Sequence, residues 1–408
     1  MTRKSDRRLE LRADPLLTEK LTYAIGPQHP SLPAPVCLRV QADGELIERV
    51  TPEVGFMHRG VERLCQERGY DECAGLLSRC EWLAGMNADY LVSAAVEQLC
   101  GIEIPEHTQW LRMILLELSR IASHLFWFGQ LGLDAGQITA IFWALREREG
   151  ALDLFALLSG KRWHHGYIVP GGVRAEPPDR FFFELREYLD GLERRIEEYE
   201  EFFSDNAIWV NRGELIGVLD MDYALRHGAS GPVLRGSGAA HDLRRDQPYL
   251  RYGEVDFEVP VGEYGDVLDR YRVRFEEMRQ SLRIIYQCLT RVMSLPSPVA
   301  QAPLLAPDDN AGVAQAPLLA DQNREHGGSR YSEGSIPAGE AYVAVEGPRG
   351  ELGLSLISDG GPGPARLHLR SPSLYHLHLL DELCRGYLLA DLFVIYSSLD
   401  IMIGEVDR

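Results

Sequence analysis

The stretch from His107 to His165 limits what this 408-residue chain can fold into more than any other, because its apolar residues recur at helical spacing. The first half has such residues at Leu111, Leu115, Leu118, Ala122 and Leu125. The second half has them at Ile138, Ile141, Leu145, Leu152 and Phe155, and it stops at Gly160. The pattern predicts two long amphipathic helices that flank Asp134.

Three polar residues, Glu117, Arg120 and His124, share one face of the first helix through their i, i+3 and i+4 spacing. Three glycines are then expected to loosen the chain around the acid: Gly129, Gly132 and Gly136. A helix pair rich in Leu and Trp is more often core than active site, so the pattern alone indicates packing. A membrane span over residues 122–145 is rejected, because polar side chains interrupt the run and would be costly in lipid.

Composition narrows the possible functions. A hydrophobic content of 45% can bury a substantial core, and a net charge of -19 argues against binding nucleic acid or anionic lipid heads. The basic residues near the start, Arg3 to Arg8, have no apolar segment behind them, so no secretory signal is predicted and we expect the protein to stay on the cytoplasmic side. None of the seven cysteines forms a C-x-x-C pair, which predicts free thiols and no zinc or iron–sulfur site.

The first 55 residues predict a small sheet with a loop. Strands are expected over Leu21 to Ile25, Val36 to Gln41 and Leu46 to Val50, the last two joined at the hairpin signal Asp43-Gly44. Four prolines in the segment 26–35 forbid a helix there, and the segment carries a lone histidine, His29. Such a loop can bind a ligand, although a turn explains it equally well.

The rest of the chain divides into three further regions. Residues 56–294 predict a central helical bundle with an irregular insert near 206–265; residues 295–340 form a Pro/Ala/Gly-rich loop with the segment AQAPLLA twice; residues 341–408 form an α/β part. Further helices are expected over Arg63 to Gly75, Leu76 to Leu99, Phe181 to Asp205 and Asp266 to Met293. The tail predicts strands at Ala341 to Val345, Leu352 to Ser358 and Leu367 to Arg370, and a helix over Leu374 to Leu389.

Several motifs in combination give the chain a family resemblance over nearly its whole length. They are GPQHPS at 26–31, GFMHRGVE at 55–62, LELSRIASHL at 116–125, FWALREREGALDLF at 142–155, YIVPGGV at 167–173, LRGSG at 234–238, VPVGEYGDVLDRY at 259–271, PRGELG at 348–353 and SLDIMIGEVDR at 398–408. With them the chain resembles the 49 kDa, or D, subunit of respiratory complex I, the NADH-quinone oxidoreductase. The resemblance implies a mainly helical α+β fold with a central helical bundle and small α/β parts at both ends, like the large subunit of nickel–iron hydrogenases.

Hydrogenase chemistry is nevertheless excluded by the ligands. A nickel–iron site needs four thiolates, because soft sulfur ligands hold both metals. By this match the four positions are Glu81, Ala84, Met402 and Glu405, and none of them is a cysteine.

The resemblance also implies a quinone cavity formed with neighbouring subunits. Quinone reduction takes two electrons and two protons, and the family places a His in the early loop, a Tyr after the first helices and an Asp beside the His. In this chain Pro33 stands at the His position, four residues after His29, and Trp82 stands at the Tyr position. Only the acid, Asp134, matches. It is expected to lack a partner and, if buried, to favour its neutral form. If the match is shifted, His29 or Tyr90 takes the place of a missing donor.

The positions that face the terminal iron–sulfur cluster in the family are both kept, as Arg79 and His164. The cluster would belong to a neighbouring chain, and this chain is expected to hold no cofactor itself. Without the resemblance, Arg79, His164 and Trp82 are equally well explained as an ion-pair member, an interior histidine and core packing.

Two functions follow from these residues. One is a peripheral subunit of a complex I-like redox ion pump, enzymatically active only with the B, C and I subunits and the membrane-embedded H subunit, whose quinone site has altered ligands. The other is a subunit that no longer reduces quinone and serves as a scaffold or coupling element.

Overall fold

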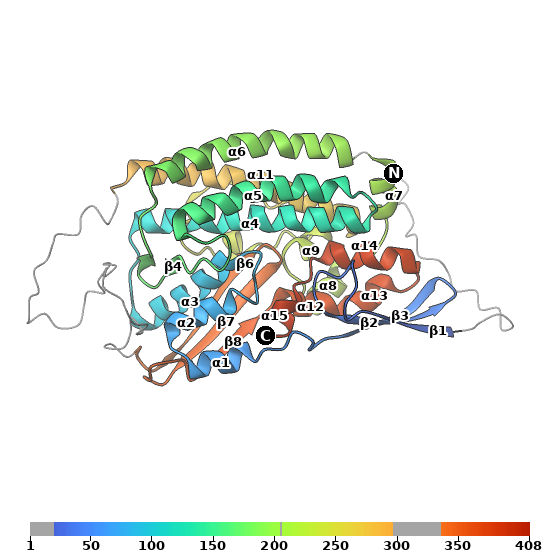
Figure 1. Cartoon of the computed structure of the whole chain (residues 1–408), viewed down its shortest axis with the longest axis horizontal. Helices are drawn as coiled ribbons and strands as arrows, with labels where there is room; N and C mark the ends of the chain where they lie inside the picture. The colour runs from blue at the N-terminus through green and yellow to red at the C-terminus, as the bar shows by residue number, and fades with distance from the viewer. Residues whose placement is uncertain (1–19, 205, 297–335) are drawn as a thin grey trace, which may run out of the picture.

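Four long helices lie side by side in the computed structural model of the chain, which describes residues 20–204, 206–296 and 336–408 (Figure 1). They are α4 (Glu106–Asp134), α5 (Thr139–Ser159), α6 (Asp179–Tyr199) and α11 (Val267–Ser294). Helix α4 contacts α5 and α11, and α6 contacts the same two helices, so the four form a bundle. The bundle confirms the long helices that the apolar spacing predicts.

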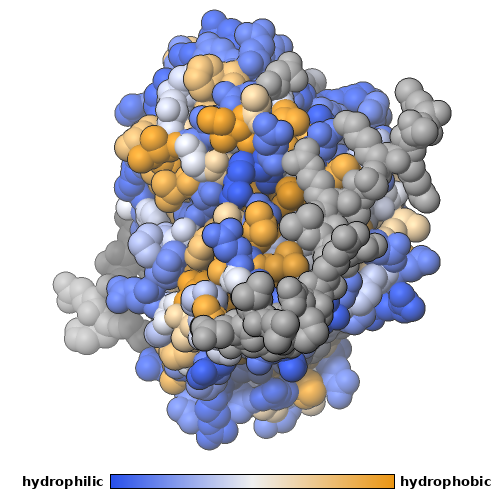
Figure 2. Space-filling view, turned by 90° about the vertical axis from the view of Figure 1, so that its right-hand side faces the viewer, coloured by the Kyte–Doolittle hydropathy of each residue, from blue (hydrophilic) through white to orange (hydrophobic). Residues whose placement is uncertain are grey.

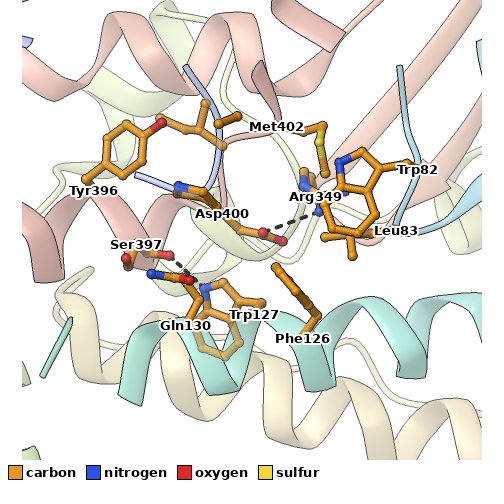
Figure 3. A pocket seen from close by; sticks show the side chains of 13 residues that line it. Trp82, Leu83, Phe126, Trp127, Gln130, Arg349, Tyr396, Ser397, Asp400 and Met402 are labelled. Atoms are coloured by element: carbon orange, nitrogen blue, oxygen red, sulfur yellow. Dashed lines mark hydrogen bonds and ion pairs between the residues drawn. The ribbon is translucent and has the colours of Figure 1, made fainter. Parts of the chain in front are cut away.

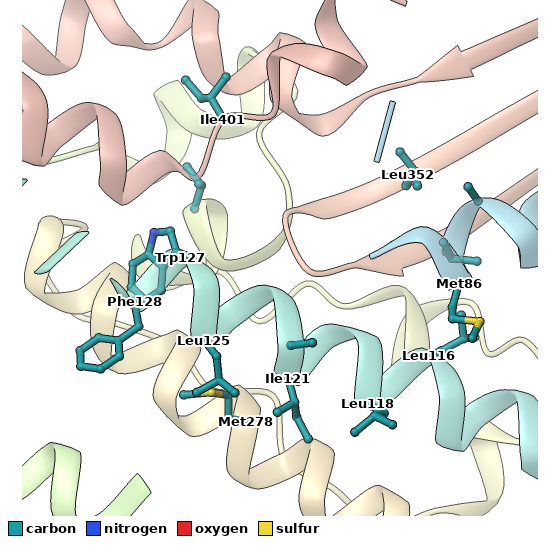
Figure 4. Packing of buried hydrophobic residues seen from close by; sticks show 14 of the residues in the cluster. Met86, Leu116, Leu118, Ile121, Leu125, Trp127, Phe128, Met278, Leu352 and Ile401 are labelled. Atoms are coloured by element: carbon teal, nitrogen blue, oxygen red, sulfur yellow. The ribbon is translucent and has the colours of Figure 1, made fainter. Parts of the chain in front are cut away.

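Helix α4 runs through the core of the molecule and is buried over most of its length. Its apolar side chains pack against α11 through Met278, and its end reaches the C-terminal segment near Ile401 (Figure 4). Gly129 and Gly132, predicted to loosen the chain, do not interrupt this helix, whereas Gly136 turns the chain after Asp134 with a positive φ of 87°. Gly132 instead allows close packing, because a Cβ atom there would lie 2.3 Å from the Cβ of Ala140 on α5.

The N-terminal sheet has three antiparallel strands in the order β1 (Lys20–Ile25), β2 (Cys37–Asp43) and β3 (Leu46–Glu53). These are the strands that the sequence predicts. The sheet is tied to the C-terminal region, since the Ile47 amide donates to the Tyr387 carbonyl at 2.9 Å and the Gly386 amide donates back to Ile47 at 2.9 Å. The loop of residues 26–35 also contacts the C-terminal region, since the His29 ring stacks on Phe393.

The helices that follow are shorter than expected. They are α1 (Val61–Glu67), α2 (Tyr70–Leu77) and α3 (Gly85–Cys100). The single helix predicted over Leu76 to Leu99 is therefore wrong, because residues 78–84 form a turn between α2 and α3. Glu81 in this turn accepts a hydrogen bond from the Ala84 amide at 3.0 Å and is held by Arg349, a residue far along the chain.

The region near 206–265 is irregular, as the sequence predicts. Its elements are the short helices α7 (Ala207–Gly213), α8 (Met221–Arg226), α9 (Gly231–Gly236), α10 (Leu243–Asp246) and the 3-10 turn η2 (Tyr252–Glu254). A π-helical turn η1 (Glu200–Ser204) continues α6, and a two-stranded ladder of β4 (Ile168–Val169) and β5 (Gly172–Val173) lies after α5. Of these pieces, α7 and α9 contact α11, and β4 contacts α3.

The C-terminal part contains a second antiparallel sheet, in the order β6 (Gly339–Gly347), β7 (Gly350–Ser358) and β8 (Arg366–Arg370). The sheet packs on α3 and confirms the three predicted strands. Four helices complete the chain: α12 (Pro372–His378), α13 (Leu380–Cys384), α14 (Leu389–Leu399) and α15 (Ile403–Val406). The helix predicted over Leu374 to Leu389 is broken, because Gly386 takes a positive φ of 84° and turns the chain before α14.

The polar face of α4 is occupied by a buried ionic network. Glu117 lies 3.1 Å from Arg120 and 3.1 Å from Arg244, and the His124 imidazole lies 2.9 Å from Glu277. Burial alone would raise the pKa of Glu117, but the two guanidinium groups lower it to about 2. The stripe found in the sequence is thus a structural core feature, which joins α4 to α11 and to the irregular region.

The fold is mainly helical α+β, as predicted. The likeness to nickel–iron hydrogenases and the division at residues 55, 294 and 340 stay predictions. Both copies of AQAPLLA and the basic residues near the start lie outside the described residues. Among the helices that are described, none is long and apolar enough to cross a membrane.

Candidate functional site

A narrow pocket opens between α14, the C-terminal part of α4 and the turn that precedes α3 (Figure 3). Its edge at the early loop is formed by Pro33 and Ala34. The other apolar lining residues are Trp82, Leu83, Phe126, Trp127, Ile401 and Met402, and the polar ones are Gln130, Arg349, Tyr396, Ser397 and Asp400. A mostly apolar pocket with a few convergent polar groups is the usual form of a site for a small organic ligand.

Arg349 supplies the positive charge of the pocket. Its side chain is buried, and its Nη1 donates to both carboxylate oxygens of Glu81 at 2.8 and 2.6 Å. Its Nη2 lies 3.4 Å from a carboxylate oxygen of Asp400. Two acids therefore hold the guanidinium in place, and the tight turn between β6 and β7 brings it to the pocket.

Asp134, the last residue of α4, lies behind two polar lining residues, Gln130 and Ser397, which form the polar wall of the pocket. Its Oδ2 accepts a hydrogen bond from Gln130 Nε2 at 3.1 Å and another from the hydroxyl of Ser397. The expectation that this acid lacks a partner is therefore wrong, although its Oδ1 is buried without one. Burial raises the pKa of Asp134 above its ordinary value, and the hydrogen bonds from Ser397 and Gln130 offset only part of this increase. The shift has the expected direction, toward the neutral form of the acid.

His29 lies outside the pocket. Its ring stacks on Phe393 of α14, with centroids 4.9 Å apart, and its Nδ1 accepts from the Ser31 amide at 3.2 Å. The loop that carries it forms a separate hollow together with Pro33. His29 is still close enough to Asp134 for a positive charge on its ring to lower the pKa of that acid. Pro33 and Trp82 share the pocket, whereas His29 lies outside its lining.

Trp82 joins the pocket to a stack of aromatic and cationic side chains. Its ring stacks on Trp163 at 4.9 Å and meets the edge of Phe126 at 5.4 Å. The guanidinium of Arg148 lies over Trp163, 4.9 Å from the ring centroid. Trp82 therefore packs on both sides, and one of its neighbours, Trp163, is 39% exposed at the surface.

Arg79 and His164 lie near this stack, and the structure brings them together. The His164 Nδ1 is 3.2 Å from the Ser78 carbonyl and 3.3 Å from its hydroxyl, one residue before Arg79. Burial lowers the pKa of His164, and the positive charge of Arg79 lowers it further. Arg79 is exposed and His164 half-buried, so both are open to a neighbouring chain.

The four positions that would hold metal in a hydrogenase also meet. The carboxyl groups of Glu81 and Glu405 interact inside the protein, Ala84 follows the same turn, and Met402 lines the pocket. Burial and the negative charge of Glu81 raise the pKa of Glu405 well above its ordinary value, whereas Arg349 keeps that of Glu81 low despite burial. Two carboxyl groups and one guanidinium thus stand where, by the resemblance, a metal site would need thiolates.

No metal-ligand cluster is found in the described parts of the chain: no group of three or more His, Cys, Asp or Glu side chains is placed to hold an ion. The seven cysteines are all free. The expectation that an iron–sulfur cluster near Arg79 and His164 belongs to a neighbouring chain stays a prediction.

None of the five polar residues of the pocket is predicted as a site residue from the sequence: Gln130, Arg349, Tyr396, Ser397 and Asp400. Arg349 lies in the motif PRGELG and Asp400 in the motif SLDIMIGEVDR, both of which carry the family resemblance. Their position in these motifs is the signal that could have identified them. Tyr396 lies in an apolar helix and gives no signal by pattern.

The chain is similar to known proteins over almost its full length. Residues 134–408 match the family described as respiratory-chain NADH dehydrogenase, 49 Kd subunit. Sequence identity is 41% over 395 residues with the D subunit of NADH-quinone oxidoreductase from Geotalea uraniireducens, and the match covers 96% of this chain and 99% of that protein. It is 41% over 396 residues with the protein of the same name from Geobacter sulfurreducens, covering 96% and 99%. It is 40% over 399 residues with that from Rhodopseudomonas palustris strain TIE-1, covering 97% and 98%.

Proposed function

The chain belongs to the family of the 49 kDa subunits of respiratory-chain NADH dehydrogenase, and from this premise we propose that its pocket beside Trp82 receives the head of a quinone. The chain would act as one subunit of a multisubunit NADH-quinone oxidoreductase that pumps ions, and not alone. The observation that carries this proposal is the pocket itself, which joins Trp82 and Pro33 to the polar wall in front of Asp134.

The lining suits a quinone ring in two respects. The ring is flat and apolar on its faces, and the pocket offers Trp82, Phe126 and Met402 as apolar contacts. Its two carbonyl oxygens need hydrogen-bond donors once electrons arrive. Polar side chains such as Arg349 and Ser397 stand in the same lining.

Electrons would enter from the side of Arg79 and His164. An iron–sulfur cluster of a neighbouring subunit would supply them singly, and Arg79 would place a positive charge near that cluster. The turn of residues 78–82 runs from His164 to the pocket, since Ser78 contacts His164 and Trp82 lines the pocket. The electron-entry surface and the quinone pocket are therefore separated by a single turn of backbone.

Asp134 is the acid that would serve the proton side of the reaction. Its raised pKa keeps the carboxyl protonated to a higher pH than an ordinary aspartic acid, and Ser397 links it to the pocket lining. Reduction of a quinone to quinol consumes two electrons and two protons, so a polar connection from the pocket to Asp134 is of direct use. The residues of this chain would thus bind the ring, orient it and deliver protons.

Neighbouring subunits of the B, C, I and H types would cover the exposed apolar side chains of this chain. The chain itself would lie on the cytoplasmic side of the membrane as a peripheral subunit. The end of the bundle where α5 begins shows several such residues, among them Ile138 at 58%, Phe142 at 66%, Phe202 at 50% and Ile208 at 53% exposed. Figure 2 shows apolar groups among charged ones on this end of the molecule. Apolar side chains of this size in contact with water support a partner surface.

Purification of the tagged chain from its native host tests the partner proposal. We expect it to bring down iron–sulfur subunits and a membrane subunit in fixed ratio. Recovery as a lone monomer without an iron–sulfur partner would refute it.

The quinone proposal is tested by filling the pocket. Ala34→Phe places a ring at the pocket edge, whereas Ala365→Phe does the same at an exposed alanine outside it. In the purified complex the first change should raise the KM for quinone about tenfold, the loss expected when about 1.4 kcal/mol of binding is removed. The control should leave it unchanged, and both variants should still pass electrons from NADH to ferricyanide. Equal quinone kinetics in both variants would place the quinone elsewhere.

The same experiment separates the scaffold alternative. A wild-type complex that reduces ferricyanide but no quinone would show that the chain couples or supports the complex without serving quinone. The observation that favours this alternative is Pro33, which brings no donor to the pocket edge.

A further inference from the structure

Three buried oxygen atoms in and beside the pocket have no hydrogen-bond partner within the described residues. They are the hydroxyl oxygen of Tyr396, Oδ2 of Asp400 and Oδ1 of Asp134. Buried polar atoms are nearly always hydrogen-bonded, so a cluster of unsatisfied ones marks a place that a polar ligand or water completes. Of the three, only the tyrosine hydroxyl can donate a hydrogen bond without first taking up a proton.

Tyr396 is fixed by its position in α14. It is 1% exposed, and the helix that carries it is packed on α4 and α11. Its neighbour Ser397 is held by the Trp127 indole, which donates to the Ser397 carbonyl at 2.8 Å. The ring therefore has little freedom to turn away and satisfy its hydroxyl elsewhere, and the pocket is the open space beside it.

The electrostatic surroundings keep this hydroxyl protonated. Burial raises the pKa of Tyr396, and the negative charges of Asp134 and Asp400 raise it further. A tyrosine whose pKa is raised in this way is a neutral hydrogen-bond donor near neutral pH. Trp82, by comparison, offers an indole N–H from the other side of the pocket.

Tyr396 and Trp82 lie on opposite sides of the pocket, with Asp400 and Arg349 between them (Figure 3). The two carbonyl oxygens of a para-quinone also lie at opposite ends of its ring. A ring that rests against the Asp400–Arg349 pair would point one carbonyl toward the tyrosine and the other toward the tryptophan. The apolar lining from Phe126 and Met402 leaves the faces of such a ring in apolar contact.

We propose that the Tyr396 hydroxyl is the hydrogen-bond donor to one carbonyl oxygen of the bound quinone, in place of a donor on the early loop. The donor binds the ground-state carbonyl and holds the negative charge that develops on its oxygen as electrons arrive. This inference rests on the proposed function, because it assigns a residue role at the same pocket. It goes beyond it in naming the residue that replaces the side chain missing at Pro33.

Tyr396→Phe removes the hydroxyl and keeps the ring. Tyr188→Phe is a matched control, because the Tyr188 hydroxyl on α6 is also buried without a partner but lies outside the pocket. In the purified complex with NADH and a short-chain benzoquinone, we expect Tyr396→Phe to lower kcat/KM for quinone about 10- to 100-fold. The control variant should not change, and neither variant should change the NADH–ferricyanide rate. Tyr396→His, which restores a donor, should recover part of the loss.

The outcomes separate the two proposals. If the wild-type complex reduces quinone and Tyr396→Phe does so equally well, the role of Tyr396 is refuted while the quinone pocket stands. If the wild-type complex reduces ferricyanide but neither a benzoquinone nor a naphthoquinone, the proposed function itself fails. The kinetic comparison thus assigns a failure to one proposal or the other.

A second measurement does not depend on whether Tyr396→Phe assembles. The wild-type complex is loaded with benzoquinone labelled with ¹³C at its carbonyl carbons, and infrared difference spectra are recorded. A hydrogen bond from Tyr396 should shift the band of the carbonyl that it binds to lower frequency than in apolar solvent, whether or not Trp82 shifts the other band. Two unshifted carbonyl bands would overturn the proposal. Where Tyr396→Phe does assemble, the shifted band should return to the free frequency.

Discussion

Glu117 is the residue whose change tests the buried ionic network most directly. Its carboxylate accepts hydrogen bonds from Tyr252 at 2.7 Å and Ser281 at 2.6 Å, in addition to its ion pairs with Arg120 and Arg244. Glu117→Gln keeps the size of the side chain and removes its charge. Two buried guanidinium groups would then lose a shared counter-charge.

The size of the effect follows from the pKa of Glu117. The folded protein lowers it from an ordinary 4.5 to about 2, and this preference for the ionised form corresponds to roughly 3 kcal/mol. Removal of one partner from a buried ion pair costs about 3–5 kcal/mol in other proteins. We therefore expect Glu117→Gln to lower the free energy of unfolding of the chain by about 3 kcal/mol.

Pulse proteolysis in urea measures this free energy for one chain within the purified complex, when the tagged chain is followed on blots. Because the pKa is lower in the folded state, the stabilisation by Glu117 is fully present above about pH 4.5 and is lost as the pH falls toward 2. The difference in the free energy of unfolding between wild type and variant should therefore be constant from pH 5 to 7 and should decrease only below that range.

Glu72→Gln is the control, because Glu72 pairs with Arg68 at 2.8 Å on an exposed face of α2. An exposed pair contributes about 0–1 kcal/mol. If Glu117→Gln lowers the free energy of unfolding by no more than this control does, the charge of Glu117 does not stabilise the buried network and the prediction is wrong.

Three further predictions concern the site and the backbone. Arg79→Met should lower the midpoint potential of the neighbouring cluster by tens of millivolts in an electron paramagnetic resonance titration, since it removes a positive charge; an unchanged signal would remove that role. Pro33→His combined with Trp82→Tyr adds two proton donors to the pocket and should raise quinone reduction several-fold; no increase would show that other groups already supply them. Gly350→Ala should prevent stable assembly, because its Cβ would lie 2.4 Å from the Ser230 hydroxyl at a φ of +132°, whereas Gly191→Ala on an open helix face should assemble normally.

The bundle could be predicted because its evidence is local. Apolar residues at helical spacing over 107–165 and 266–293 need no knowledge of distant contacts, and the predicted helices appear as α4, α5 and α11. The two small sheets were predictable for the same reason, through alternation and a hairpin signal. The motifs were also enough to recognise the family that the comparisons show.

The turn of residues 78–84 shows where local evidence ends. Its sequence continues a helical pattern, yet the chain leaves the helix there. In the turn, the Glu81 carboxylate accepts a hydrogen bond from Arg349, which is 268 positions away. A local pattern carries no information on such a contact, and a buried charge outweighs a modest helix propensity. The tertiary contact thus places Trp82 in the pocket.

The sequence by itself determined the long helices of the bundle, the two small sheets and the family. It also gave the candidate positions, which are Pro33, Trp82, Asp134, Arg79 and His164. Only the tertiary structure decided which of them meet. It placed Pro33 and Trp82 on one pocket and gave Asp134 two hydrogen-bond donors on its Oδ2. It also added Tyr396, whose apolar helix hides it from any pattern. The physical reason is that an unsatisfied hydroxyl is a property of its surroundings, and these are assembled from segments hundreds of residues apart.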